Sequence, residues 1–546
     1  MPVISVDSEE LLKFTDAEEI DLLDALPKLG IEIEAIEDEK WELEVNPDRC
    51  DLLSVEGIGR AVKGFLGKET GLKRYSIKES DIVTEAELSV QEVRPFIVTA
   101  FVKNIDLNED ILKSLMDLQE KLHLTLGRGR KKVAIGVHDF GPIEPPFVYK
   151  AVRPEEVSFV PLEKHREMNL EEILERHEKG VEYAHVLEDK ERYPVILDSN
   201  DNVLSFPPVI NGTLTQVTED SDTLFIDMTG TDEKMLDYTL NILCTMYAER
   251  GADIYTTKVK YGSQEKVYPD LSTDKIEIDP SECSKLLGVE LEDEDVLQLL
   301  EKMRFDGKIK DDKIEVEIPA YRHDILHPWD IVEDIAIGFD YDNFEGTLPE
   351  DVTIGKRLKD DKLKNSVTDL LVGYGFTEVM NYPLSNPEKE IGFLSEDGED
   401  LSLVQNPVTE DKTCLRKWLL PSPLSNLREN RNKSLPQKIF EIGDVVVNDK
   451  QYTKIAGTVT HPEAGFSEMK SLMQGLLENL GINPSFESKE HDAFVEGRCA
   501  GIIVDEDEIG FYGEIHPEVL DRFDLENPVI GFELNLEKIM DMKERF

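Results

Sequence analysis

Four acidic side chains near the middle of the chain have the residue type and spacing of a cation-binding site. Asp330, Glu333 and Asp334 are spaced i, i+3 and i+4, so in a helix their carboxylates point to the same side. Asp324 lies upstream and can fold back toward them. Carboxylate oxygens are ligands for hard divalent cations such as Mg²⁺ or Ca²⁺. The same acids also suit the first turns of a solvated helix, so spacing alone leaves both interpretations open.

A predicted strand and a predicted helix must position these acids. Residues 313–318 (KIEVEI) alternate apolar and polar, which is typical of a strand. Pro328 can begin a helix because its missing N–H costs nothing in the first turn, and Gly338 can end it. Ile331 and Ile335 form a separate apolar face. The sequence therefore predicts a strand, a loop that carries Asp324 and a helix that carries the other three acids.

Polar residues in two predicted strands of the first half form a second candidate site. Residues 204–211 (LSFPPVIN) precede residues 224–232 (LFIDMTGTD), where Asp-x-Thr-Gly presents a carboxylate and a hydroxyl beside a glycine turn. The alternative is structural, with Asp227 capping a turn and Thr229 filling a strand position. The residues by themselves favour this structural interpretation. The sequence presents no Ser-His-Asp or Cys-His arrangement of a nucleophile.

The clearest basic cluster lies at residues 127–132 (GRGRKK). It stands out because the chain carries 116 acidic against 61 basic residues, a formal net charge of −55. The cluster either binds phosphate groups or lies in a solvated loop, and the sequence favours neither interpretation over the other. The candidate phosphate-binding residues are Arg128, Arg130, Lys131 and Lys132.

Composition limits the class of protein. A chain of 546 residues is expected to form about three to five domains. No apolar run reaches the roughly 18–20 residues that span a bilayer, and the acidic N-terminus lacks a signal-peptide layout, so we expect a soluble cytoplasmic protein without membrane contact. Five scattered cysteines without a CxxC pair argue against a zinc site and a disulfide framework. Acids spread through every region indicate adaptation to high internal salt.

The periodicity of apolar residues predicts an α+β multidomain protein. A polar stretch near residues 76–86 has the composition of a linker. Two short helices at 281–287 and 294–303 suggest a winged-helix-like module, although they are too acidic to lie on phosphates. The expected domains are a small N-terminal α/β domain at 1–75, a second domain at 86–262, the module with the acidic motif at 272–345 and a C-terminal domain at 350–546.

Two long motifs give the chain a family resemblance. Arg322-His-Asp324, followed by Asp330-Ile-Val-Glu-Asp334 and Tyr341-Asp-Asn343, resembles the acidic signature of the β subunits of phenylalanyl-tRNA synthetases. The run 45–62 (VNPDRCDLLSVEGIGRAV) resembles the N-terminal hallmark of that family, and its glycines fall inside an apparent helix rather than in a nucleotide loop. The resemblance covers nearly the whole chain and is to the archaeal and eukaryotic form.

The resemblance implies two sites. The Mg²⁺ ligands of the family, shared with an α subunit, map onto Asp324, Asp330, Glu333 and Asp334. The second domain resembles an editing domain that binds tyrosine wrongly attached to tRNA(Phe) and hydrolyses the ester, with a positioned water as the expected nucleophile. A pocket that hydrogen-bonds the phenol hydroxyl would select this substrate, because an unpaired buried polar group is costly. The pocket residues carried over are Asn211, Asp227, Thr229 and Ser205.

The C-terminal domain resembles a catalytically inactive class II synthetase core, an antiparallel sheet flanked by helices. Active class II sites grip ATP with an arginine in an F-R-x-E strand and a second arginine in a G-x-G-x-x-R segment. The matching strand here reads Lys438-Ile-Phe-Glu-Ile, and neither motif is present. Without these charge-assisted donors an ATP site would bind poorly.

The resemblance implies an (αβ)₂ heterotetramer that uses ATP to attach phenylalanine to tRNA(Phe), with synthesis in the α subunit. This chain would supply structure, tRNA contacts, part of the Mg²⁺ site and editing. Two alternatives belong to other classes. One is a standalone hydrolase that deacylates mischarged tRNA, and the other is a non-catalytic nucleic-acid-binding scaffold.

Overall fold

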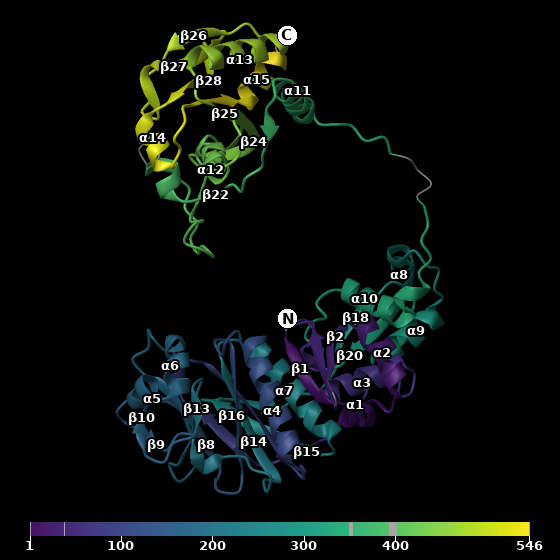
Figure 1. Cartoon of the computed structure of the whole chain (residues 1–546). Coiled ribbons are helices and arrows are strands. Elements are labelled where there is room, and N and C mark those ends of the chain that lie inside the picture. Colours follow the sequence, from purple (N-terminus) through teal and green to yellow (C-terminus); the bar gives the residue numbers. More distant parts are fainter. Residues whose placement is uncertain (1, 38, 349–352, 393–400, 545–546) are drawn as a thin grey trace. The chain divides into compact units, whose positions relative to one another are not determined.

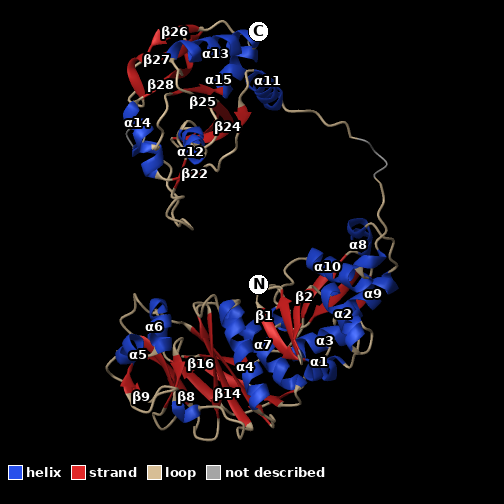
Figure 2. Cartoon of the chain, in the orientation of Figure 1, coloured by secondary structure: helices blue, strands red, loops and turns tan. Residues whose placement is uncertain are grey.

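The structure, a computed structural model, describes residues 2–37, 39–348, 353–392 and 401–544 (Figure 1). The chain forms two compact units, residues 1–348 and 349–546. Helices and several separate sheets occur in the molecule (Figure 2), so the prediction of an α+β multidomain protein is confirmed. Within the described ranges, no helix is long and apolar enough to cross a membrane.

The first unit begins with a three-stranded antiparallel sheet in the order β1-β3-β2. Helix α3 buries Val55, Ile58 and Val62. The glycines of the hallmark lie inside this helix, as predicted, and a Cβ at Gly57 would lie only 1.8 Å from the carbonyl oxygen of Asp51, so close packing requires glycine there. The elements are β1 Val3–Asp7, α1 Ser8–Thr15, α2 Glu19–Lys28, β2 Ile31–Glu37, β3 Lys40–Val45, η1 Cys50–Leu52 and α3 Val55–Phe65.

Two larger sheets follow, in the orders β4-β15-β6-β14-β7 and β13-β12-β11-β8-β5-β16-β17. Helix α4 packs against β7, and helix α7 packs against β6 and β14. The strands of the first sheet are β4 Ile77–Lys78, β6 Phe96–Lys103, β7 Val133–Asp139, β14 Thr223–Gly230 and β15 Asp253–Tyr255. Those of the second are β5 Val83–Ala86, β8 Phe147–Val152, β11 Tyr193–Leu197, β12 Val203–Phe206, β13 Ile210–Asn211, β16 Thr257–Tyr261 and β17 Gln264–Tyr268. The other elements are η2 Leu88–Val90, α4 Glu109–Leu124, β9 Ser158–Phe159, β10 Met168–Asn169, α5 Leu170–Arg176, α6 Glu178–Tyr183, η3 Ala184–Val186, η4 Thr213–Thr215 and α7 Glu233–Glu249.

The stretch near residues 76–86 is not a linker, and that prediction is wrong. Strand β4 pairs in parallel with β15, and β5 pairs in parallel with both β8 and β16. Thr84 and Ala86 are buried while Glu85 between them is exposed. Very short strands with one polar face have too few apolar residues to be distinguished from a linker by composition.

The module with the acidic motif contains a three-stranded antiparallel sheet in the order β18-β20-β19. Strand β20 (Lys313–Ile318) and helix α10 (Pro328–Phe339) confirm the predicted strand and helix. The helix passes the expected stop at Gly338, which lies inside it, and is followed by Asp340 with φ 73°. The other elements are β18 Asp274–Ile278, α8 Pro280–Leu287, α9 Asp293–Lys302, β19 Asp306–Lys310 and η5 Tyr341–Asn343.

The second unit is built on a seven-stranded sheet in the order β21-β24-β25-β29-β28-β27-β26, antiparallel except between β21 and β24. Helices α11, α13 and α15 join one apolar cluster, and α12 and α14 join another. The adjacent residues Ile455 and Ala456 of β25 belong to different clusters, so helices cover both faces. The strands are β21 Thr377–Glu378, β22 Leu384–Ser385, β23 Cys414–Leu415, β24 Gln437–Val447, β25 Lys450–Thr460, β26 Ser485–Ser488, β27 Phe494–Val504, β28 Asp507–Ile515 and β29 Val529–Asn535. The helices are α11 Lys359–Gly373, η6 Glu388–Gly392, α12 Pro421–Glu429, α13 Phe466–Asn479, α14 Pro517–Arg522 and α15 Leu536–Glu544.

Candidate functional sites

The acidic motif is organised around the guanidinium of Arg322. Its Nε lies 2.9 Å from Asp324 Oδ1, and its Nη2 lies 2.6 Å from both Asp324 Oδ2 and Asp334 Oδ2. Arg322 and Asp334 are buried. Burial by itself would lower the pKa of Arg322, but the two carboxylates hold it well above its ordinary value. A protein cation therefore neutralises two of the four predicted cation ligands.

The other two acids are placed differently. Asp330 Oδ2 accepts hydrogen bonds of 2.7 Å from the backbone N–H groups of Leu326 and His327, which is a helix-capping role. Glu333 is exposed on the next turn of α10. Partial burial, followed by the negative field of Asp334 and other nearby carboxylates, raises the pKa of Glu333.

These residues fit a hydrated Mg²⁺ rather than a cation enclosed by four carboxylates. Because Asp324 and Asp334 direct their oxygens at Arg322, Glu333 and the second oxygen of Asp330 are left for a cation. Mg²⁺ commonly binds through one or two carboxylates and keeps several waters. When bound, it would supply positive charge among the acids.

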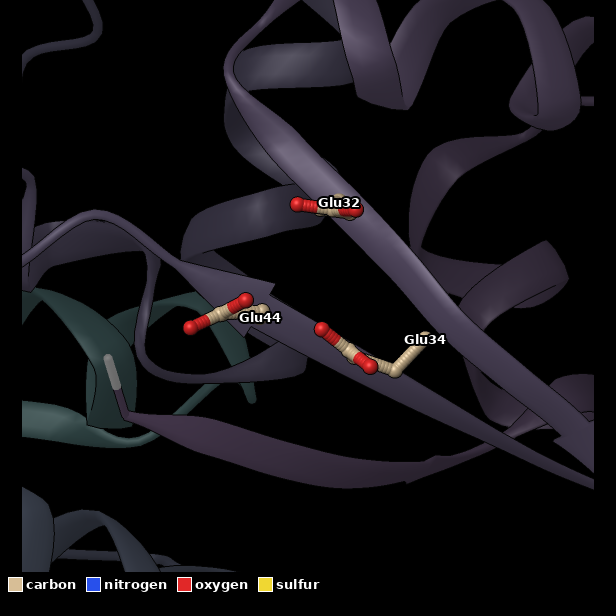
Figure 3. Close-up of side chains that lie close together, drawn as sticks. All are labelled: Glu32, Glu34 and Glu44. Carbon is tan, nitrogen blue, oxygen red and sulfur yellow. The ribbon is translucent and has the colours of Figure 1, made fainter. Parts of the chain in front are cut away.

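A different carboxylate cluster lies on β2 and β3. Oxygens of Glu32, Glu34 and Glu44 come within 4.8 Å of one another (Figure 3). A hydrogen bond with Glu44 is the main reason why the pKa of Glu34 is raised. Exposed carboxylates often lie close together without an ion, so this cluster does not identify a metal site.

A buried charge network connects the acidic motif to the N-terminal hallmark. Arg49 Nε lies 2.9 Å from Asp51 Oδ1, and Arg60 Nη2 lies 3.8 Å from Asp51 Oδ2. The Arg60 guanidinium also stacks 3.5 Å above the ring of Tyr321, next to Arg322. Although burial opposes it, the field of Arg49, Arg322 and Arg60 holds the pKa of Asp51 well below its usual range. The two family motifs therefore share one electrostatic environment.

This network has a consequence for stability at acid pH. The pKa values of Asp51 and Asp324 are depressed in the folded chain. Their contribution to the free energy of unfolding is therefore fully present above about 3.9, the pKa of an aspartate in the unfolded chain. It is lost as the pH falls through their lower pKa in the folded chain. We expect the free energy of unfolding to fall with pH below about 4. Urea unfolding of the wild type and of Asp51→Asn between pH 3 and 7 measures this, and an equal slope for both would contradict it.

The second candidate site lies on strands β7 and β14. Asp227 Oδ2 is 2.6 Å from His138 Nε2, and His138 Nδ1 is 2.7 Å from Thr215 Oγ1. The side chains of Asp227 and His138 are 2% and 0% exposed. Gly136 stands opposite Asp227 in the antiparallel register. A Cβ at Gly136 would lie 2.4 Å from Asp227 Oδ2 and 2.9 Å from His138 Nε2, so the pair requires glycine there.

Thr229, two residues along the same strand, contacts a buried arginine. Arg94 Nε donates to Thr229 Oγ1 at 2.9 Å, and its Nη2 donates to the Thr229 carbonyl at 2.7 Å. Among the described residues no carboxylate lies within ion-pair distance of Arg94. Burial lowers the pKa of this guanidinium to about 10, partly offset by Tyr149 and Asp227. The hydroxyl of Tyr149 donates to the Arg94 carbonyl at 2.8 Å.

Asn211 and Ser205 approach from the other sheet. They are opposite each other in the β12–β13 pair, and Asn211 Nδ2 donates to the carbonyl of Val137, the neighbour of His138, at 3.4 Å. The buried hydroxyl of Ser205 makes no hydrogen bond within the part of the chain that the structure describes. The predicted pocket residues Asp227 and Asn211 thus each contact a residue of β7. Thr229 lies on the same strand as Asp227, and Ser205 lies opposite Asn211 on the neighbouring strand β12.

Sequence reasoning missed His138, Thr215 and Arg94. His138 carried one usable signal, a single histidine within the otherwise apolar strand 133–138. Its pairing with Asp227 joins positions 89 residues apart and was not visible from spacing.

We expect Gly136→Ala to disturb this site without altering either partner. The added methyl has to displace the Asp227 carboxylate or the His138 ring, and overpacking of this kind costs about 1–3 kcal/mol. Thermal unfolding measures the loss. Gly141→Ala is the matched control, because its Cβ would make only an ordinary 3.4 Å contact with Asp139. Equal unfolding temperatures for the two variants would contradict the assignment.

The basic cluster is partly structural. Arg130 is buried, with Nη2 2.6 Å from Glu120 Oε1 and the guanidinium 4.1 Å from the Tyr183 ring centre. Lys132 Nζ lies 2.8 Å from Asp232. Arg128 and Lys131 are exposed. Only these last two leave their charge open to a phosphate.

In the second unit the strand matched to F-R-x-E is β24. Glu441 is fully buried and accepts 2.7 Å hydrogen bonds from Arg416 Nη1 and Asn381 Nδ2. Arg416 Nε also donates to the Asp444 carbonyl at 2.7 Å. The polar groups of this strand are satisfied within the chain itself.

Three family models match the chain. The B3/4 domain covers residues 95–261, the tRNA synthetase B5 domain covers 276–341, and the phenylalanyl tRNA synthetase beta chain CLM domain covers 345–536. Among solved structures, an N-terminal fragment of the phenylalanyl-tRNA synthetase β-subunit from Pyrococcus horikoshii matches with a TM-score of 0.60 and 38% identity. The match covers 62% of this chain and 99% of that fragment.

Curated relatives match from end to end. The phenylalanine–tRNA ligase beta subunits of Archaeoglobus fulgidus and Methanosarcina acetivorans are each 42% identical to this chain, over 100% of both sequences in each comparison. An identity of 42% over the full length shows that the chain and these proteins belong to one family. The chain therefore belongs to the family of phenylalanine–tRNA ligase β subunits and is a subunit of an aminoacyl-tRNA ligase, an enzyme of protein biosynthesis.

Proposed function

We propose that the chain assembles with an α subunit into an (αβ)₂ heterotetramer in the cytoplasm, where it serves the attachment of phenylalanine to tRNA(Phe) with ATP. The full-length match to β subunits carries this proposal. Synthesis belongs to the α subunit, because β24 offers a buried, internally paired Glu441 where an ATP site needs an arginine. The five cysteines are free and buried, which suits a reducing compartment.

The proposed division of labour follows four domains. The N-terminal α/β domain (1–75) and the winged-helix-like module (272–345) form a supporting body around the shared charge network. The domain at 86–262 edits, and the class II-like core at 350–546 docks on α. Exposed Arg128 and Lys131 in the editing domain offer the tRNA backbone two positive charges.

Editing is proposed to be the hydrolysis of Tyr-tRNA(Phe) at the site of Asp227, Thr229, Asn211 and Ser205. The supporting observation is a group of buried polar side chains between strands of two sheets, including a Ser205 hydroxyl without a partner among the described residues. Such a site favours a substrate that brings its own hydrogen-bonding group, here the phenol hydroxyl.

One set of assays separates this proposal from its alternatives. The chain is purified alone and with a candidate α subunit, and ATP–pyrophosphate exchange, charging of tRNA(Phe) and deacylation of Tyr-tRNA(Phe) are measured. We expect no exchange by the chain alone and exchange and charging with α. Deacylation without any effect of α would favour a standalone hydrolase, and tRNA binding without either reaction would favour a scaffold.

We further propose that Mg²⁺ binds at the acidic motif in the assembled enzyme, through Glu333 and Asp330 and with Asp324 and Asp334 close by. We expect a hundredfold excess of Mg²⁺ over its Kd to stabilise the wild-type complex by about 2.7 kcal/mol and to have far less effect on Glu333→Gln. Thermal unfolding with and without Mg²⁺ measures this. Asp312→Asn, in an exposed turn of the same module, is the control. An equal change in unfolding temperature on adding Mg²⁺ to the wild type, Glu333→Gln and Asp312→Asn would reject the site.

A further inference from the structure

We propose that His138 is a positioning residue that aims Asp227 at the hydroxyl of a bound tyrosyl group and so sets the preference for tyrosine over phenylalanine. The proposal rests on the contact between His138 and Asp227 and on the proposed editing function. It assigns a role to a side chain that no sequence motif indicated.

The two oxygens of Asp227 have different surroundings. Oδ2 lies 2.6 Å from His138 Nε2. Oδ1 accepts no hydrogen bond from any residue in the described ranges. Whichever partner holds the shared proton, Oδ2 is committed to His138 and Oδ1 is left to accept a hydrogen bond from a ligand.

His138 is held on its other sides as well. Nδ1 lies 2.7 Å from Thr215 Oγ1, and the Phe225 ring centre is 6.4 Å from that of the imidazole. Gly136 gives room for the close approach to Asp227. Because both ring nitrogens already have a hydrogen-bond partner, His138 has no polar atom left for a substrate. It acts through the carboxylate.

An oriented carboxylate oxygen distinguishes the two amino acids by chemistry. The phenol hydroxyl of a tyrosyl group donates to Oδ1. The ring of a phenylalanyl group brings no donor and leaves the oxygen desolvated and unpaired, which is costly. Without His138 the carboxylate is no longer held in one orientation. Its hydrogen bond to the phenol hydroxyl then requires it to be ordered on binding, so the preference for the tyrosyl over the phenylalanyl group falls.

The test uses the αβ complex and two readouts. The first is the rate of Tyr-tRNA(Phe) hydrolysis. The second is the ratio of affinities for 3′-amide analogues of tyrosyl- and phenylalanyl-adenosine, which bind without being hydrolysed. The variants are His138→Leu, Asp227→Asn, the double variant and His138→Gln, whose amide N–H can still donate to Asp227.

We expect the wild type to prefer the tyrosyl analogue at least about tenfold, which corresponds to one hydrogen bond of about 1.4 kcal/mol. His138→Leu should lose this preference as fully as Asp227→Asn, the double variant should lose no more, and His138→Gln should keep part of it. A retained preference in His138→Leu, or independent losses that multiply in the double variant, would overturn the proposal. If His138→Leu does not fold, His138→Gln and Gly136→Ala test the role of His138 in its place. Both should weaken the tyrosyl preference, and an undiminished preference in both would overturn the proposal.

The readouts keep the two proposals apart. Tyrosyl preference that depends on His138 without any hydrolysis would reject editing and keep the positioning role. Hydrolysis that is indifferent to His138 in rate and preference would keep editing and reject the positioning role.

Discussion

Arg322→Met is expected to destabilise the first unit by about 3–5 kcal/mol, the usual cost of removing one partner from a buried ion pair. The methionine fills much of the volume of the arginine but leaves Asp324 and Asp334 without their shared cation. Asp334 suffers most, because its side chain is 5% exposed and both of its oxygens face the guanidinium. The aromatic ring of Phe305, 4.9 Å from the guanidinium carbon, loses its cation as well.

Tryptophan fluorescence gives a direct measurement of this loss. Of the three tryptophans, Trp41 and Trp329 lie in the first unit and Trp418 lies in the second. In a Trp418→Phe background, the urea transition of the first unit is therefore followed alone. Lys275→Met, which breaks the exposed pair with Glu315, is the control and should change stability by no more than about 1 kcal/mol.

A rescue variant makes the electrostatic reason testable. Adding Asp324→Asn and Asp334→Asn to Arg322→Met removes the uncompensated charges and should restore part of the stability. If Arg322→Met costs no more than Lys275→Met, or if the triple variant is less stable than the single one, the network does not have the role assigned to it.

Asp227→Asn is expected to slow the hydrolysis of Tyr-tRNA(Phe) roughly 10- to 100-fold and to leave the charging of tRNA(Phe) with phenylalanine unchanged. The substitution keeps the volume of the side chain but removes a charged acceptor, whose hydrogen bonds are worth about 1.5–3 kcal/mol. Charging is unaffected because the synthetic site is proposed to lie in the α subunit.

Both rates are measured on the αβ complex, with Tyr-tRNA(Phe) for hydrolysis and free phenylalanine for charging. Asp222→Asn is the matched control, since Asp222 is an exposed aspartate immediately before the same strand. Asp227→Asn with undiminished hydrolysis would remove this residue from the editing site. Equal losses in hydrolysis and charging would indicate a general defect of the complex.

Local sequence signals predicted the elements around the acidic motif. Alternation gave β20, and Pro328 at the first position marked the start of α10. The same signals were insufficient at β4 and β5, where two- and four-residue strands depend on pairing with distant partners. Their polar composition is that of an exposed segment because only alternate side chains enter the core.

The interior of each site was harder to predict than its residues. Spacing marked the four acids as candidate cation ligands, but it did not reveal that Arg322 lies between two of them. Asp227 was a candidate through the family resemblance, whereas its partner His138 lies on β7 and is itself contacted by Thr215 from η4. Such contacts form only after the strands have paired. Which buried side chains then face each other cannot be predicted from a single sequence.

The charge network between residues 49–60 and residues 321–334 bears on how the chain is made. A ribosome releases the N-terminal hallmark long before it has translated Tyr321 and Arg322, so Arg49, Asp51 and Arg60 emerge without part of their electrostatic surroundings. Contacts this distant in sequence form late and slowly. Residues 49–60 therefore reach their final electrostatic surroundings only after nearly all of the first unit has been synthesised, and until then the charges of Arg49, Asp51 and Arg60 are compensated only in part.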